Sequence, residues 1–160
     1  MNITDTTPTE SNLSGLDRKD FQKNINSRKT DLYILKNAQG MEVAVTNYGC
    51  AILSIMVPDK NGKFANVILG HDSIEHVINS PEPFLSTTIG RYGNRIANGK
   101  FTLYGEEHQL TVNNGPNSLH GGPTGFHARV WDAVQPNEST VIFNCLLYTS
   151  PSPRDSTSSR

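Results

Sequence analysis

Alternating apolar and polar positions dominate the chain between residues 31 and 145. In the segment MEVAVTNYG, residues 41–49, the side chains of Met41, Val43 and Val45 share one face, which is the period-two pattern of a β-strand. The segment AILSIMV, residues 51–57, is almost continuously apolar and predicts a strand buried on both faces. Further strands are predicted at DLYIL (31–35), ANVIL (65–69), KFTLY (100–104), HQLTV (108–112), ARVWDAV (128–134) and STVIFNCLL (139–147).

Turn residues separate these predicted strands. Gly, Asn and Asp cluster at residues 37–40, 58–62 and 97–100, where hairpins need backbone conformations that these residues adopt easily. No helical pattern of ten or more residues follows residue 30, and no internal repeat is found. The pattern therefore predicts an all-β fold, an antiparallel sandwich or barrel.

The chain divides into three parts by composition. Residues 1–24 are rich in Thr, Ser, Asn and charge and are predicted to be a flexible lead-in, with one short helical turn near its end. Residues 25–145 carry the strand pattern and are predicted to form one domain. Residues 146–160 hold few large apolar side chains and are predicted to be a disordered or non-native tail. The second alternative is favoured, because CLLYTSPSPRDS resembles translated adapter or vector sequence.

Composition limits the partners that the chain can attract. Fourteen basic and fifteen acidic residues in 160 leave a net charge of −1, so no overall field draws it to nucleic acid or to an anionic membrane. The polar start of the chain and the absence of a long apolar run favour a cytoplasmic protein. Cys50 and Cys145 are isolated in sequence, which predicts free thiols and no zinc site.

Two glycine-rich segments carry the candidate chemistry. In GRYGNRI, residues 90–96, Asn94 offers both donors and acceptors and Arg95 a planar fork of donors, an inventory that suits a polyhydroxylated ligand. The alternative is a surface turn whose arginines pair with carboxylates. In NSLHGG, residues 117–122, His120 could donate to a sugar oxygen, act as an acid or base, or cap its own loop. A metal site is disfavoured, because no second ligand stands at a suitable spacing.

The other histidines are predicted to be structural. A buried polar ring is ordinarily hydrogen-bonded within the protein, and this is the expectation for His71, His76, His108 and His127.

Three segments together resemble the aldose 1-epimerase family, which includes the galactose mutarotases. They are GRYGNRIANGKF (90–101), NNGPNSLHGG (113–122) and GFHARVWD (125–132), and the similarity to the N-terminal part of the family runs from about residue 29 to about residue 134. The resemblance implies a large antiparallel β-sandwich that interconverts the α and β anomers of a free hexose, such as galactose or glucose, with no metal or cofactor. It also implies that Asn94, Arg95 and His120 bind the sugar.

The resemblance also implies what the chain lacks. In the family a second histidine acts as general acid and a glutamate as general base, and both lie beyond the position where this chain ends. Because mutarotation needs one acid and one base, we expect no catalytic residue here and no measurable activity from the 160 residues alone. The expected partner is a small-molecule hexose.

Two alternative functions stay open at the level of sequence. A hexose-6-phosphate 1-epimerase would use extra basic residues for the phosphate, and Arg91 lies close to Arg95, although the LHGG segment favours a free sugar. A non-catalytic carbohydrate-binding β-sandwich would need exposed aromatic side chains for stacking. Trp131 lies in an alternating strand, where core packing is the expectation.

Overall fold

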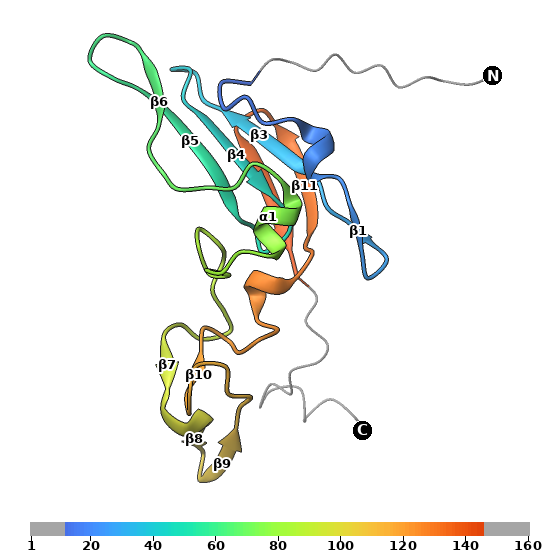
Figure 1. Ribbon diagram of the computed structural model, residues 1–160, viewed down its shortest axis with the longest axis vertical. Helices are drawn as coiled ribbons and strands as arrows, with labels where there is room; N and C mark the ends of the chain where they lie inside the picture. Colours follow the sequence, from blue (N-terminus) through green and yellow to red (C-terminus); the bar gives the residue numbers. More distant parts are fainter. Residues whose placement is uncertain (1–11, 146–160) are drawn as a thin grey trace, which may run out of the picture.

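The computed structural model describes residues 12–145, and its regular secondary structure consists mostly of antiparallel strands (Figure 1). The upper part in Figure 1 is a four-stranded sheet with a hairpin behind it, and the lower part is a smaller lobe of short strands. In residues 12–145 no helix is long and apolar enough to cross a membrane. The architecture is an antiparallel β-sandwich, one of the two architectures that the alternating pattern predicts.

Four consecutive strands form the main sheet in the order β3-β4-β5-β6. Asn37 and Asp59 shape two of its turns, because each side-chain oxygen accepts hydrogen bonds from backbone amides two and four residues further on. The strands are β3 (Leu32–Lys36), β4 (Glu42–Thr46), β5 (Ile52–Pro58) and β6 (Phe64–Asn66).

The better-buried face of β4 is the one that carries the polar side chains of Glu42 and Thr46, not the one that carries Met41 and Val43. Glu42, Ala44 and Thr46 are fully buried, whereas Met41 and Val43 are only half-buried. The alternation of Met41, Val43 and Val45 therefore identifies the strand without identifying its most covered face. Two hydrogen bonds make burial of the Glu42 carboxylate possible: Leu13 N donates to Oε2 at 2.9 Å and Ser14 N to Oε1 at 3.0 Å.

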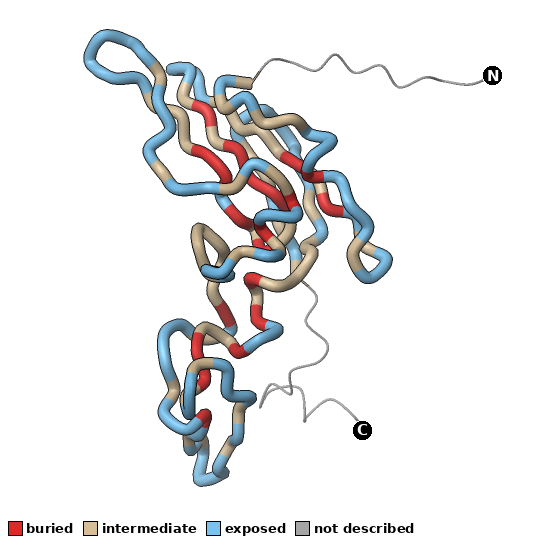
Figure 2. Tube along the Cα trace, viewed as in Figure 1, coloured by how far each residue is buried: buried red, intermediate tan, exposed pale blue. Residues whose placement is uncertain are grey.

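The hydrophobic core lies between the main sheet and two short helical segments that cover it. These are η1 (Arg18–Phe21) and α1 (Ile74–Ile78), and α1 begins where the Ser73 side chain caps the amide of His76. Figure 2 shows the buried positions along these segments. The core cluster consists of Phe21, Leu32, Ala44, Ala51, Leu53, Ile74 and Val77.

The described part of the predicted lead-in contributes to this core. Phe21 is fully buried, and Leu16 packs against the core cluster. Residues 12–24 therefore carry packed structure, including the short helical turn that the sequence predicts at η1, followed by the hairpin β1 (Asn24–Ile25) and β2 (Arg28–Lys29). The division of the chain at residue 24 and the nature of residues 1–11 stay predictions, as does the proposed tail, which lies outside the described residues.

The hairpin of β11 (Asp132–Asn137) and β12 (Thr140–Asn144) forms a second layer behind the main sheet (Figure 1). Tyr33 and Phe143 meet edge to face with ring centroids 5.9 Å apart, and the Lys36 amide donates to the Glu138 carbonyl at 2.7 Å. Ile142, the neighbour of Phe143 in β12, points to the opposite face of the hairpin and is 49% exposed.

Several predicted strands differ in length or burial from the observed ones. The strand predicted at 65–69 ends at Asn66, and Val67 and Leu69 are exposed. Ile52 in β5 is 37% exposed, so the prediction that this strand is buried on both faces is wrong at that position. Its apolar run reflects a strand with one side only partly covered.

The smaller lobe contains two short antiparallel pairs. One pair joins strands that are far apart in sequence, and the other joins strands that follow each other directly. Their elements are β7 (Arg95–Ile96) with β10 (Ser118–Leu119), and β8 (Lys100–Leu103) with β9 (Glu106–Gln109). The 3-10 turns η2 (Ala97–Gly99) and η3 (Phe126–Ala128) flank them. The two-residue strands β7 and β10 are too short to give a periodic signal in the sequence.

Candidate functional site

The two glycine-rich segments lie side by side in the smaller lobe. Pairing of β7 with β10 sets Leu119 opposite Arg95, and this register brings the residue before β7 next to the residue after β10. The His120 amide donates to the Asn94 carbonyl at 3.0 Å, and the Asn94 amide donates to Nδ1 of His120 at 3.0 Å. Asn94 and His120 therefore hold each other in place by two hydrogen bonds.

Asn94 and His120 both adopt the left-handed backbone conformation, with φ of 57° and 54°. Asn and His enter this region more readily than most non-glycine residues, and at each position the chain turns sharply out of its short strand. The turns leave the Asn94 side chain exposed and the His120 ring partly exposed. Both side chains can therefore reach a ligand in solvent.

Arg95 is held beside this pair by amide groups and not by a carboxylate. Its Nε donates to Oδ1 of Asn114 at 2.8 Å, and its Nη1 lies 3.4 Å from Oδ1 of Asn94. These contacts of Arg95 do not include the carboxylate partner that the surface-turn alternative requires. Because amide partners leave the positive charge uncompensated, the guanidinium keeps donors for a ligand.

The loop before His120 is fixed by the side chain of Asn113. Its Oδ1 accepts from the Leu119 amide at 2.7 Å, and its Nδ2 donates to the Leu119 carbonyl at 3.0 Å. The side chain therefore acts as a short additional strand partner for residue 119. This clamp holds the backbone immediately before His120.

Close backbone approach in the lobe requires glycine. A side chain at Gly121 would overlap the carbonyl oxygen of Gly90, and one at Gly90 would overlap the ring of Phe126. Gly121 also has φ of +88°, a conformation that L side chains rarely adopt. Gly90 and Gly121 thus allow the two glycine-rich segments to touch.

Phe84, which the sequence does not single out, contacts the rings of both His120 and His127. The Phe84 ring lies 4.8 Å from the His120 ring and 4.5 Å from the His127 ring, between centroids. His127 is 6% exposed, and its Nδ1 has no hydrogen-bond partner. The prediction of a hydrogen-bonded structural histidine is therefore wrong for this atom, because the ring is buried mainly against Phe84. No sequence signal marks Phe84, which follows two prolines in a loop.

Burial of His127 lowers its pKa from 6.5, and the nearby charge of His120 lowers it further. As the pH falls, the unfolded chain therefore binds a proton at His127 before the folded chain does. The stability that neutral His127 contributes is complete above pH 6.5 and is lost as the pH falls from 6.5 to the lowered pKa. We expect a lower thermal midpoint at pH 5 than at pH 7.5. Substituting His127→Phe should reduce this difference in scanning calorimetry, and an unchanged difference would contradict the assignment.

The remaining predicted residues lie elsewhere. His108 stacks on Phe101 with centroids 5.0 Å apart, and His76 pairs with Asp72 at 2.5 Å near α1. Trp131 is partly buried, packs edge to face on Phe126 and donates from Nε1 to the Phe126 carbonyl. It offers no open stacking platform of the kind that the carbohydrate-binding alternative requires.

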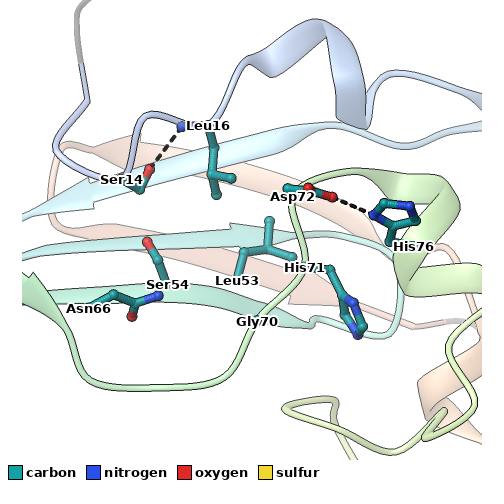
Figure 3. A pocket seen from close by; sticks show the side chains of 9 residues that line it. All are labelled: Ser14, Leu16, Leu53, Ser54, Asn66, Gly70, His71, Asp72 and His76. Atoms are coloured by element: carbon teal, nitrogen blue, oxygen red, sulfur yellow. Dashed lines mark hydrogen bonds and ion pairs between the residues drawn. The ribbon is translucent and has the colours of Figure 1, made fainter.

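A separate hollow lies beside the main sheet, between β5, the segment at residues 14–16 and the approach to α1 (Figure 3). It encloses about 300 Å³. Ser54 and Asn66 line it from β5 and β6, and Asp72 faces His76 across the loop before α1. None of the three predicted sugar-binding residues borders this hollow, and the candidate chemistry stays with the smaller lobe.

The site in the smaller lobe presents neutral and cationic hydrogen-bond donors. Because Nδ1 of His120 accepts a backbone hydrogen bond, the neutral ring carries its proton on Nε2. Arg95 adds guanidinium donors and Asn94 an amide. Among residues 12–145 no three His, Cys, Asp or Glu side chains gather in a way that could hold a metal ion. The arrangement can bind a ligand rich in oxygen acceptors.

Comparison with known proteins places the chain in a family. The aldose 1-epimerase family profile matches residues 31–153. Galactose mutarotase of Bos taurus is 43% identical over 91 residues, covering 57% of this chain and 26% of that protein. Aldose 1-epimerase of Escherichia coli K12 is 40% identical over 112 residues, covering 70% of this chain and 32% of that protein.

Solved structures agree with the sequence comparison. The GalM/aldose epimerase homologue from C. elegans superimposes with a TM-score of 0.67 at 33% identity, covering 71% of this chain and 35% of that chain. The fold and the paired loops define an all-β protein of the mutarotase-like sandwich class. The chain belongs to the aldose 1-epimerase family. It spans about a quarter to a third of the length of these relatives.

Proposed function

We propose that this chain supplies the sugar-holding part of an aldose 1-epimerase site that binds a free hexose such as galactose or glucose. The observation that carries the proposal is the reciprocal hydrogen bonding of Asn94 and His120, with the Arg95 guanidinium beside them. Membership of the family supports it, since the relatives are aldose 1-epimerases and galactose mutarotases by name.

Mutarotation sets the chemical requirements of such a site. Ring opening moves a proton from the C1 hydroxyl to a general base while a general acid protonates the ring oxygen, and closure on the other face reverses both transfers. Donors that do not exchange protons can hold the other hydroxyls and keep the sugar in a reactive orientation. We assign this positioning role to Asn94, Arg95 and His120.

We further propose that the acid and the base are contributed from outside the described residues. Asn94, Arg95 and His120 form hydrogen bonds with backbone groups, asparagine amides and one another, and within residues 12–145 no glutamate is among these partners. Loss of one proton-transfer group costs about 10²–10⁴-fold in rate. Residues 25–145 would then be the N-terminal part of the family's domain, active only when completed.

Galactose titration followed by two-dimensional NMR tests the binding role. We expect amide shifts at residues 94–95 and 119–121 that saturate with sugar, and an Arg95→Ala variant should bind roughly tenfold more weakly, the loss typical of a hydrogen bond from a charged group. Arg18→Ala is the matched control, because Arg18 is an exposed arginine that pairs with Asp31 far from the site. Equal affinity in the parent and Arg95→Ala chains would contradict the role of Arg95.

Polarimetry of freshly dissolved α-galactose tests the catalytic part separately. We expect the 160-residue chain to leave the spontaneous rate unchanged. A saturable acceleration would overturn the proposal that these 160 residues lack the acid and the base, without affecting the binding role.

A further inference from the structure

Phe84 contacts two histidine rings, that of His120 in the candidate site and that of His127. We propose that Phe84 and His127 are positioning residues, which fix the His120 imidazole so that it presents Nε2–H as a hydrogen-bond donor to a sugar oxygen. The inference rests on the proposed function for its ligand, but the orientation of the ring can be measured without any sugar.

The identity of the donor follows from the contact with Asn94. A backbone amide can only donate, so the bond from the Asn94 amide to Nδ1 of His120 requires a lone pair on Nδ1. The proton of the neutral ring is then on Nε2. In this state His120 has no free lone pair and cannot remove a proton from a sugar hydroxyl, so its contribution is to donate.

One hydrogen bond fixes a single atom of the ring and leaves rotation about it open. Phe84 restricts this rotation, because its ring lies 4.8 Å from His120 with an interplanar angle of 59°. The segment after Phe84 is tied to the main sheet, where the Ile52 amide donates to the Ser86 carbonyl at 2.9 Å and Ser86 Oγ donates to the Leu69 carbonyl at 3.1 Å. The main sheet therefore fixes the position of Phe84, and Phe84 in turn restricts the His120 ring.

His127 also packs against Phe84. Its ring is buried with Nδ1 unpartnered, so no hydrogen bond at that atom accounts for its placement. The T-shaped contact with Phe84, 4.5 Å between centroids, does. The backbone near His127 is anchored to Gly49, which lies between β4 and β5 of the main sheet. A side chain at Gly49 would overlap the His127 carbonyl, and the Gly49 amide donates to the Arg129 carbonyl at 2.7 Å.

Nitrogen-15 NMR of the histidine rings in the full chain tests the inference. The parent chain should have His120 in the Nε2–H form at pH 7.5. Substituting Phe84→Leu or His127→Ala should free the ring, giving a mixture of the two neutral forms, whereas Phe84→Tyr and His127→Phe, which keep a ring in place, should restore the parent signal. Galactose affinity should fall about two- to tenfold in the two ring-removing variants, as for loss of an aromatic pair contact.

Phe101→Leu is the matched control, because Phe101 also stacks on a histidine, His108, at 5.0 Å in the same lobe, and it should leave the His120 signal unchanged. A His120 ring protonated on Nδ1 in the parent, or one unaffected by both Phe84→Leu and His127→Ala, would overturn the inference. If the ring responds as expected but galactose does not bind the parent chain, the positioning role stands and the proposed function is what fails.

Discussion

Replacing Gly121 with alanine is expected to disrupt the smaller lobe. The added methyl group would overlap the Gly90 carbonyl oxygen, which is backbone and cannot rotate away, and the residue would be held at φ of +88°. The backbone conformation alone costs about 1–2 kcal/mol, and displacement of the Gly90 segment adds to it. We expect a total loss of more than about 3 kcal/mol in urea unfolding, with loss of the ordered amide signals of residues 94 and 120.

Gly105→Ala separates the two contributions. Gly105 has nearly the same backbone angle, φ of +85°, but no atom lies within 4 Å of the position that the methyl group would take. It should therefore cost only the conformational part, about 1–2 kcal/mol. Equal losses for the two substitutions would contradict the close approach of Gly121 to Gly90.

Removal of the buried carboxylate of Glu42 is expected to have the second largest effect. Glu42→Ala deprives the amides of Leu13 and Ser14 of their acceptor, and it leaves Lys36, whose Nζ lies 3.8 Å from the carboxylate, without its partner. Each stranded backbone donor costs about 1–3 kcal/mol unless it reaches water. We expect a loss of about 3 kcal/mol and faster amide hydrogen exchange at residues 13–16.

Two further variants test whether the loss of stability is due to the buried carboxylate. Glu42→Gln keeps one acceptor oxygen and should retain part of the stability, while Glu106→Ala removes an exposed acid and should change the free energy of unfolding by less than about 0.5 kcal/mol. If Glu42→Ala unfolds at the same urea concentration as Glu106→Ala, the carboxylate does not hold the segment at residues 12–16 to the sheet.

The sequence was sufficient to predict the strands that are long and bounded by turn residues. The alternation at residues 41–49 and the Asn and Asp turns at 37–40 and 58–62 correspond to the β3-β4-β5-β6 sheet, because local hydrogen bonds and side-chain periodicity define these elements. The two motif segments were also recognisable in sequence. Their direct contact, however, depends on β7 and β10, which have two residues each and no periodicity to detect.

What the sequence did not reveal depends on partners distant along the chain. Glu42 reads as an exposed residue of an alternating strand, and its burial follows only from amides 28 and 29 residues earlier. Phe84 carries no motif, and the GFHARVWD segment that contains His127 does not mark it as a neighbour of His120. Their relation to His120 arises from the way the sheet brings three loops together. Periodicity cannot report such contacts, since it describes only neighbours within one element.

The hydrogen bonds between Asn94 and His120 close a segment whose ends are 26 residues apart. Closing a flexible loop of that length costs on the order of 3 kcal/mol in chain entropy, more than two ordinary hydrogen bonds return. The side-chain clamp of Asn113 and the β7–β10 pair offset the remainder from within the same segment. The order within residues 94–120 and the attachment of this segment to the sheet through Phe84 are thus separate contributions to the free energy of folding. Residues 94–120 can therefore loosen as one unit while the sheet stays folded.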